Sequence, residues 1–257
     1  MRGAERTRGA ISYLSILALL HEELRPAHYL EIGVRDGRSL ALAGGPATGV
    51  DPAPSIKYVL PAKTEIVQMT SDAFFAQAAA HFAPDFCLID GTHLFEYALR
   101  DFINVERCAA PGAVVVIDDI LPNNRVQALR RRRTVAWTGD VWRLMEVLQR
   151  HRPDLFLLPI DTAPSGLLLI AGLDHSNRTL EENYAALTAE PAPNPIPPRY
   201  ILERRGVISS EQVLRRVLAV LKETRRCGVL PLQAVERLRE AASGSRDHMP
   251  EGTELRE

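Results

Sequence analysis

The chain has 257 residues, of which 46% are hydrophobic and 25% charged, the composition of an ordinary globular protein with a full hydrophobic core. A formal net charge of −1 argues against binding to nucleic acid or to an anionic membrane through overall charge. The 3 cysteines are scattered along the chain, which excludes a disulfide framework and a metal knuckle and indicates a reducing compartment.

The longest apolar run near the N-terminus is at residues 11–20. It is too short to span a bilayer and has no cleavage site after it, so we expect an amphipathic helix packed on the domain. The protein is therefore predicted to be cytoplasmic, with neither a membrane nor a nucleic acid as its partner.

Apolar strands then alternate with helices. Helices are expected from about Ser39, at 71–82 with Ser71 as N-cap, and at 94–110. This alternation predicts a parallel sheet covered on both faces. The strands are expected at 28–34, 47–52, 64–70, 85–91 and 111–120.

Two more strands, 154–162 and 166–174, are separated only by residues 163–165. So short a link cannot carry a parallel crossover, so these strands must pair antiparallel. The predicted fold is α/β: a three-layer, doubly wound, mostly parallel seven-stranded sheet that ends in an antiparallel hairpin.

A helical C-terminal extension follows the sheet. We expect a first domain at 1–175 and a second region at 176–257. The second region contains a Pro-rich linker or strap at 189–200, amphipathic helices at 209–226 and 232–242, and a disordered tail from Ser243. The apolar stripe of these helices can cover the site or form a homodimer through residues 176–242.

The glycine turn after the first strand, Gly33 to Gly37, lets a cofactor approach the backbone closely. Arg35 breaks the dinucleotide pattern G-x-G-x-x-G, and the alternative is a tight turn without a ligand. Asp51, at the end of the next strand, can accept hydrogen bonds from two ribose hydroxyls. Asp72 can contact an adenine amino group or cap its helix.

The fourth and fifth strands end in acids, "IDGTH" and "IDDILPNN". Asp90, Asp118 and Asp119 are predicted to meet at one edge of the sheet, where their repulsion favours a hard cation such as Mg²⁺. The alternative is that they cap loops. His93 can take a proton from a substrate hydroxyl, and its acidic neighbours should raise its basicity.

Two further features carry less weight. The arginine run at 130–133 can clamp a phosphate or carboxylate, although a solvated helix face is favoured. Trp137 and Trp142 flank Asp140 and belong either to the wall of an acceptor site or to the core.

Several stretches in this order resemble class I S-adenosylmethionine-dependent methyltransferases over about residues 10–175. The resemblance is greatest to the bacterial branch with macrolide-sugar O-methyltransferases and relatives of catechol O-methyltransferase. The matching stretches are "YLEIGVRDGRSL", "GVDP", "DFCLIDGTHLFEYALRDF", "PGAVVVIDD" and "WTGDVWRLM".

The resemblance implies S-adenosylmethionine as cofactor, with a ribose contact from Asp51 and Mg²⁺ with a His93 base in metal-dependent relatives. Catechol-type enzymes have Asp-Asn where this chain has Asp118-Asp119. The sugar-modifying relatives tolerate two acids there, and the expected acceptor is a small hydroxylated metabolite. The remaining implied residues are Glu31, Gly33 and Gly37 at the methionine end, Ser71 and Asp72 beside the adenine, and Asp90, Asp118 and Asp119 around the metal.

Other functions remain open at this point. The same cofactor serves N-methylation and reactions that transfer no methyl group. A non-catalytic scaffold that binds S-adenosylmethionine is a third alternative, although it would not need His93 and the acids at the sheet edge.

Overall fold

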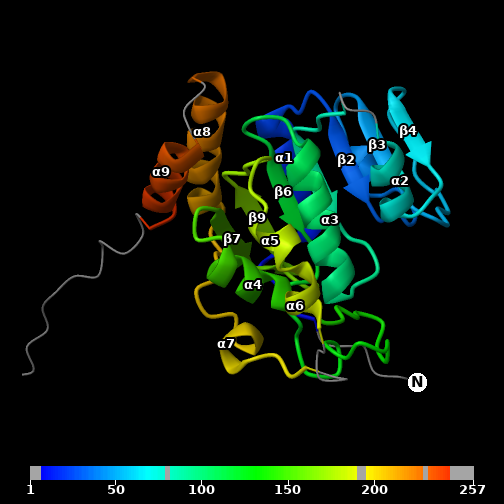
Figure 1. Ribbon diagram of the computed structural model, residues 1–257, viewed down its shortest axis with the longest axis vertical. Coiled ribbons are helices and arrows are strands. Elements are labelled where there is room, and N and C mark those ends of the chain that lie inside the picture. Colours follow the sequence, from blue (N-terminus) through cyan, green and yellow to red (C-terminus); the bar gives the residue numbers. More distant parts are fainter. Residues whose placement is uncertain (1–6, 79–81, 190–194, 228–230, 244–257) are drawn as a thin grey trace, which may run out of the picture.

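The computed structural model describes residues 7–78, 82–189, 195–227 and 231–243 (Figure 1). At its centre is a seven-stranded sheet in the order β4-β3-β2-β5-β6-β9-β7. Helices cover both faces of this sheet, as the sequence predicts. The strands are β2 (Tyr29–Ile32), β3 (Ala47–Val50), β4 (Thr64–Val67), β5 (Phe86–Ile89), β6 (Val114–Ile117), β7 (Phe156–Ile160) and β9 (Leu167–Ala171).

Only β9 among these strands is reversed, and it pairs antiparallel with both β6 and β7. The predicted antiparallel hairpin is thereby confirmed. Its short link also holds a strand that the sequence analysis did not anticipate. This strand, β8 (Thr162–Ala163), pairs parallel with β1 (Ile11–Ser12) and so attaches the N-terminal segment to the hairpin.

The two faces of the sheet are both apolar because its strands carry continuous apolar runs. Val114 and Val116 of β6 belong to one core cluster, and Val115 and Ile117 belong to the other. Helices α1 (Tyr13–Leu24), α8 (Glu211–Cys227) and α9 (Pro231–Ser243) cover the first face. Helices α2 (Ser71–Gln77), α3 (Phe95–Cys108) and α4 (Arg143–His151) cover the second.

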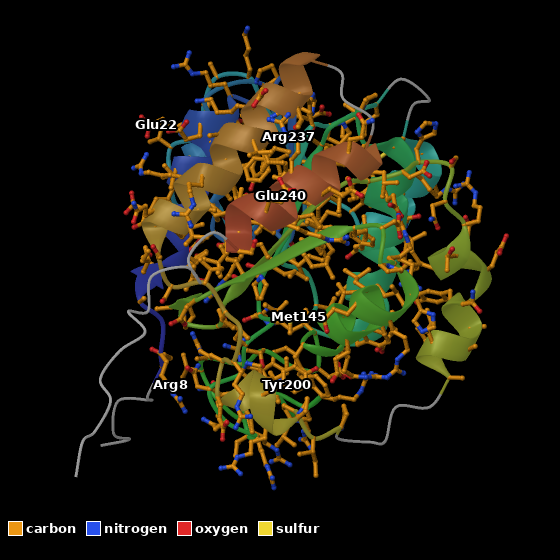
Figure 2. The ribbon with its side chains drawn as sticks, turned by 90° about the vertical axis from the view of Figure 1, so that its left-hand side faces the viewer. Arg8, Glu22, Met145, Tyr200, Arg237 and Glu240 are labelled. Carbon is orange, nitrogen blue, oxygen red and sulfur yellow. The ribbon has the colours of Figure 1, made fainter. Side chains whose placement is uncertain are left out.

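The predicted C-terminal helices are present as α8 and α9. Figure 2 shows α9, with Arg237 and Glu240, alongside α8. Leu214 and Val217 of α8 lie in the same core cluster as α1. The proposed division at residue 175 stays a prediction.

The segment before α8 contains three short helices that were not predicted: α5 (Thr179–Glu182), α6 (Tyr184–Thr188) and α7 (Arg199–Leu202). Part of the expected Pro-rich linker, residues 190–194, and the expected disordered tail beyond Ser243 lie outside the described residues. Within the described part of the chain, no helix has the length and apolar character needed to cross a bilayer.

The helix expected from about Ser39 is wrong. The structure has a single 3-10 turn there, η1 (Leu40–Leu42). Gly44, Gly45 and Pro46 follow at once, and both residue types oppose helix continuation.

The N-cap predicted for the helix at 71–82 is also wrong. Thr70 is the N-cap of α2, and its hydroxyl accepts a hydrogen bond of 3.3 Å from the backbone N–H of Ala73. Ser71 is the first helical residue, so its side chain does not cap the helix. The helix ends at Gln77, and residues 79–81 of the predicted span lie outside the described residues.

His21 is a polar residue buried between α1 and the sheet. Its ring lies edge-on to Tyr29 and Phe86, with centroids 4.5 and 4.9 Å away. Neither ring nitrogen has a hydrogen-bond partner among the described residues. Burial therefore disfavours the charged imidazolium and lowers the pKa of His21 to about 4.

This lowered pKa predicts a loss of stability in acid. Between pH 6.5 and 4 the unfolded chain binds a proton at His21 that the folded chain rejects. The free energy of unfolding is then expected to fall by up to about 3 kcal/mol as pH drops through this range. Urea unfolding of the wild type and of His21→Phe at pH 7.5, 5.5 and 4.5 measures the difference. Equal pH dependence in the two proteins would contradict the assignment to His21.

Candidate active site

The carboxyl ends of β2, β3, β5 and β6 open into a cavity of about 560 Å³. Ligands of open α/β sheets bind at this edge. The structure brings together residues that the sequence places far apart. Predicted site residues in the cavity wall are Gly33, Asp51, Ser71, Asp72, Asp90, His93, Asp118 and Asp119.

Gly33 stands where β2 packs against the end of β5. Its φ is +89°, and a Cβ atom there would lie 1.9 Å from the carbonyl oxygen of Asp90. At Gly37, φ is +83°, and a Cβ would lie 3.3 Å from the side chains of Ile56 and Leu60. The chain's own packing thus requires glycine at position 33, whether or not a cofactor also lies against this backbone.

Glu31 and Gly37 are not part of the cavity wall. Glu31 is fully buried, and its carboxylate accepts hydrogen bonds from Tyr29 Oη at 2.8 Å and Ser39 Oγ at 2.7 Å. Burial raises the pKa of Glu31 to about 7, against the lowering effect of these two hydroxyls. Its carboxylate therefore fixes the turn after β2, and a contact with a cofactor stays a prediction.

Asp51 follows β3 and faces the cavity. One carboxylate oxygen accepts a hydrogen bond of 2.8 Å from the backbone N–H of Arg35, and the other accepts one of 2.7 Å from Ala53. These bonds fix the orientation of the carboxylate. Each oxygen keeps a free lone pair, so Asp51 can also accept from two neighbouring hydroxyls.

The N-terminus of α2 forms another part of the wall. Ser71 and Asp72 lie there, and Asp72 is paired with Arg100 at 2.6 Å. Asp101 of α3 also lines the cavity and forms a hydrogen bond with the Ser71 side chain, and burial raises its pKa to about 7. Sequence reasoning missed Asp101. The sequence feature that could have revealed Asp101 is a carboxylate on the apolar face of an amphipathic helix, next to Phe102.

Across the cavity, His93 lies between two carboxylates. Its Nδ1 forms an ion pair with Asp119 and donates a hydrogen bond of 2.8 Å to the carbonyl oxygen of Trp137. Its Nε2 is 3.6 Å from Asp90 Oδ1. The Trp137 ring stacks on the imidazole at an interplanar angle of 6°. His93 is therefore held on three sides.

The backbone around this cluster is strained. His93 has φ of +56° and Asp119 has φ of +66°, both in the left-handed region. A Cβ atom at Gly139 would lie 1.7 Å from the carbonyl oxygen of His93, so only glycine allows the loop to approach. Such strain persists where the surroundings fix it, and it is concentrated at functional sites.

Burial and mutual repulsion shape the charges of the cluster. Burial, with the neighbouring Asp118, raises the pKa of Asp90 well above its ordinary range. Burial, with the neighbouring Asp119, raises that of Asp118 to about 7. Burial alone would lower the pKa of His93, but the carboxylates of Asp119 and Asp90 outweigh it and raise the pKa to about 10. At neutral pH His93 is therefore an imidazolium.

Comparison with known proteins agrees with this arrangement. Residues 30–120, which run from within β2 to beyond β6, match the family model described as a methyltransferase domain. This part of the chain is therefore similar to a methyltransferase domain. A sequence search of curated proteins finds no match.

A solved structure shares this fold. A cofactor-bound crystal structure of Rv0187 from MTB is 21% identical, with a TM-score of 0.50, and the match covers 62% of this chain and 78% of that chain. The O-methyltransferase TomG from Streptomyces achromogenes, involved in tomaymycin synthesis and solved with SAM, is 18% identical. Its TM-score is 0.46, with the same coverage of 62% and 78%.

The acids at the cavity wall fit a divalent cation. Asp90 and Asp119 each offer a carboxylate oxygen, and these atoms and a ring nitrogen of His93 lie within 4.8 Å of one another. The His93 nitrogen could bind a metal only with its ring neutral. Asp118 belongs to the same wall, but its Oδ1 accepts hydrogen bonds from the Asp119 N–H at 2.7 Å and from Ser165 Oγ at 3.3 Å. Burial, and after it the neighbouring carboxylates, raise the pKa values of Asp90 and Asp118, and a bound cation would favour their charged forms.

The tryptophans and the arginine run have different surroundings in the structure. Trp137 lines the cavity, whereas Trp142 lies in the core. The arginine run at 130–133 is in a loop, not on a helix face. Arg130 pairs with Glu96 and Asp140, each at 2.6 Å. Arg132 of the same run lines the cavity. Cavity residues without a prediction include Tyr13, Arg38, Tyr97 and Ser165.

Proposed function

We propose that the protein transfers a methyl group from S-adenosylmethionine to a hydroxyl of a small metabolite. The observation that carries this proposal is one continuous cavity, with Asp51 at one side and the cluster of His93, Asp90 and Asp119 at the other. The first side suits a ribose, and the second suits a hydroxyl that must lose its proton. The cytoplasm and a small-molecule acceptor are parts of the same proposal.

The proposed reaction is a direct displacement. The acceptor oxygen bonds to the methyl carbon as the bond from that carbon to sulfur breaks, and the hydroxyl proton leaves to a base. The products are a methyl ether and S-adenosylhomocysteine. Both substrates must lie in line, so we expect positioning to supply much of the acceleration. The rigid walls around Asp51 and His93 serve that purpose.

His93 is the proposed base, and it can act as one only when its imidazole ring is neutral. With a pKa of about 10 it holds its proton at neutral pH and cannot accept another. A divalent cation held by Asp90, Asp119 and their neighbour Asp118 would offset the charge that raises this pKa, and would also orient and acidify the acceptor hydroxyl. The pairing of Nδ1 with Asp119 orients the ring.

Replacing His93 by alanine is expected to depress turnover while leaving the affinity for S-adenosylhomocysteine within about twofold, because Asp51 and the α2 terminus form the proposed nucleoside side. Isothermal titration calorimetry with S-adenosylhomocysteine checks the affinity. Complete loss of binding in His93→Ala would rule out the assigned role.

An acceptor assay tests the function itself. The protein is incubated with methyl-labelled S-adenosylmethionine and a panel of hydroxylated and amino-bearing metabolites, with Mg²⁺ or with a chelator. We expect transfer to oxygen that the chelator abolishes. Transfer to nitrogen, or transfer that the chelator does not affect, would refute the metal-assisted O-methylation proposed here.

A further inference from the structure

Arg204 lies outside the central sheet, in the turn after α7, yet its guanidinium contacts the loop after β6 and the link between β7 and β9. The side chain is 8% exposed. One terminal nitrogen, Nη1, forms an ion pair with Asp161. The other, Nη2, donates to Asn123 Oδ1 at 3.0 Å and to the carbonyl oxygens of Pro164 at 3.3 Å and Leu121 at 3.4 Å. One side chain thus joins the loop after β6 to the link between β7 and β9.

Both of these segments are connected to Asp118 and Asp119. Leu121 is two residues after Asp119, and its N–H donates to the carbonyl oxygen of Ser165 at 2.6 Å. The hydroxyl of Ser165 donates to Asp118 Oδ1 at 3.3 Å. Pro164 and Ser165 are themselves part of the cavity wall. The route from Arg204 to the acids therefore consists of direct hydrogen bonds and short stretches of backbone.

Asn123 strengthens this connection. Its Oδ1 accepts from the N–H of Arg8 at 2.7 Å as well as from Arg204, and its Nδ2 donates to Pro164 O at 2.8 Å. In Figure 2, Arg8 and Tyr200 of α7 lie at the same end of the molecule. The N-terminal segment, the β6 loop and the C-terminal segment thus meet at Asn123.

The C-terminal segment is also attached to the sheet by its backbone. Ile208 donates to Pro159 O and accepts from the Asp161 N–H, both at 2.8 Å. This attachment places Arg204 beside the link between the last two strands. The segment around α7 is therefore part of the framework that supports the acids.

We propose that Arg204 is a positioning residue that holds Asp118 and Asp119 in the geometry needed to bind a divalent cation. This inference rests on the proposed function for the role of the cation, but not for the role of Arg204 as an anchor. Only a guanidinium can bond Asp161, Asn123 and the two carbonyls at once, because its donors form a rigid planar fork. Lysine supplies the positive charge but not this planar set of donors.

The test compares Arg204→Lys and Arg204→Ala with Arg205→Ala, a neighbouring arginine that is 65% exposed and paired with Glu203. Three properties are measured on the full chain: Mn²⁺ affinity by isothermal titration calorimetry, affinity for S-adenosylhomocysteine, and amide hydrogen exchange of residues 118–127. We expect both Arg204 variants to bind Mn²⁺ at least about tenfold more weakly, as for the loss of an outer-shell partner. Exchange at 118–127 should rise in both.

The same variants should bind S-adenosylhomocysteine within about twofold of the wild type, because Asp51 is on the other side of the cavity, and Arg205→Ala should match the wild type throughout. A folded Arg204→Lys with unchanged Mn²⁺ affinity and unchanged exchange would overturn the proposal. So would an equal loss of Mn²⁺ and S-adenosylhomocysteine affinity, which indicates general destabilisation. Failure of the wild type to bind Mn²⁺ would refute the metal role instead, and exchange at 118–127 would then decide the positioning role alone.

Discussion

Replacing Asp51 by alanine is expected to weaken binding of S-adenosylhomocysteine by about 100-fold, or about 2.7 kcal/mol. The carboxylate follows β3 at the cavity wall, and its two backbone hydrogen bonds fix it where two ribose hydroxyls can donate to it. Asparagine keeps one acceptor oxygen and loses the charge, so Asp51→Asn should lose only about tenfold. Isothermal titration calorimetry measures both affinities.

Glu65 provides the matched control. It is an exposed carboxylate on the neighbouring strand β4 and lines a different hollow. Glu65→Gln removes a carboxylate charge from a position outside the cavity wall and should bind S-adenosylhomocysteine as the wild type does. Equal affinities in Asp51→Ala and Glu65→Gln would contradict the placement of the ribose at Asp51.

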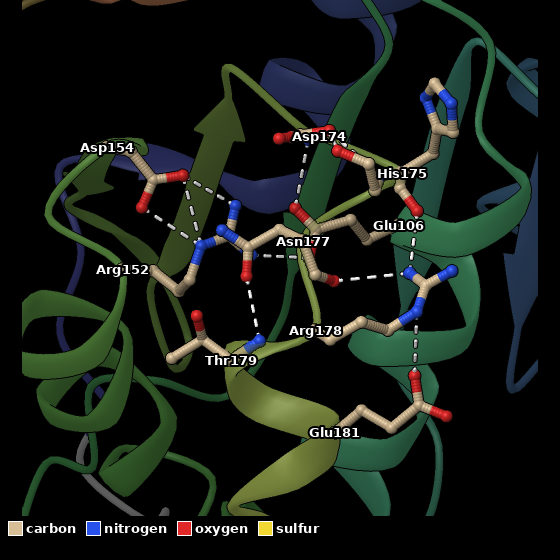
Figure 3. Close-up of polar contacts among 10 residues, drawn as sticks. Glu106, Arg152, Asp154, Asp174, His175, Asn177, Arg178, Thr179 and Glu181 are labelled. Atoms are coloured by element: carbon tan, nitrogen blue, oxygen red, sulfur yellow. Dashed lines mark hydrogen bonds and ion pairs between the residues drawn. The ribbon is translucent and has the colours of Figure 1, made fainter.

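The second large effect concerns stability, and we expect Glu106→Ala to lower the free energy of unfolding by about 3–5 kcal/mol. Glu106 of α3 accepts a hydrogen bond of 2.5 Å from Arg152, and the two side chains are 4% and 1% exposed (Figure 3). Glu106 also accepts from the Asp174 N–H at 3.2 Å. Alanine leaves a buried guanidinium with Asp154 as its remaining carboxylate partner, at 2.7 Å.

Glu181 gives the comparison for this variant. It pairs with Arg107 at 3.2 Å and with Arg178 at 3.5 Å, and all three side chains are at least 42% exposed. Water and salt screen such pairs, so Glu181→Ala should cost less than about 1 kcal/mol. Urea unfolding of both variants provides the values. A cost for Glu106→Ala no larger than that for Glu181→Ala would show that the buried pair contributes little.

The sheet could be predicted because its determinants are local in the sequence. Runs such as "VVVI" at 114–117 are apolar on both faces, and the link at 163–165 is too short for anything but an antiparallel pair. The short helices α5 to α7 were missed because each spans at most 5 residues and has too few turns to show a helical period. Their existence depends on packing against the rest of the molecule.

The site could be predicted in part, for a related reason. Asp51, Asp90, Asp118 and Asp119 each follow a strand, and parallel strands bring such positions to one edge. Which atoms come close is a tertiary property. The grouping of Asp90, Asp118 and Asp119 as metal ligands stays a prediction, and the structure adds a His93 ring nitrogen within 4.8 Å of carboxylate oxygens of Asp90 and Asp119.

Arg204 is the clearest example of a residue whose surroundings could not be predicted from the sequence. It comes from the segment that the sequence analysis treated as an extension, and its contacts are 40 to 83 residues away along the chain. Nothing near it in the sequence marks it as different from its exposed neighbour Arg205. Only the folded chain distinguishes the two, through the burial of one guanidinium among carbonyl and carboxylate oxygens.

The central claim is that the cavity at the sheet edge binds S-adenosylmethionine beside a divalent cation. Isothermal titration of S-adenosylhomocysteine into the wild-type protein, with and without Mg²⁺, tests it most directly. We predict binding of one molecule per chain in both conditions and a separate heat of Mg²⁺ binding that Asp119→Asn abolishes. Absence of S-adenosylhomocysteine binding in both conditions would contradict the account and remove the basis for every role proposed for the cavity.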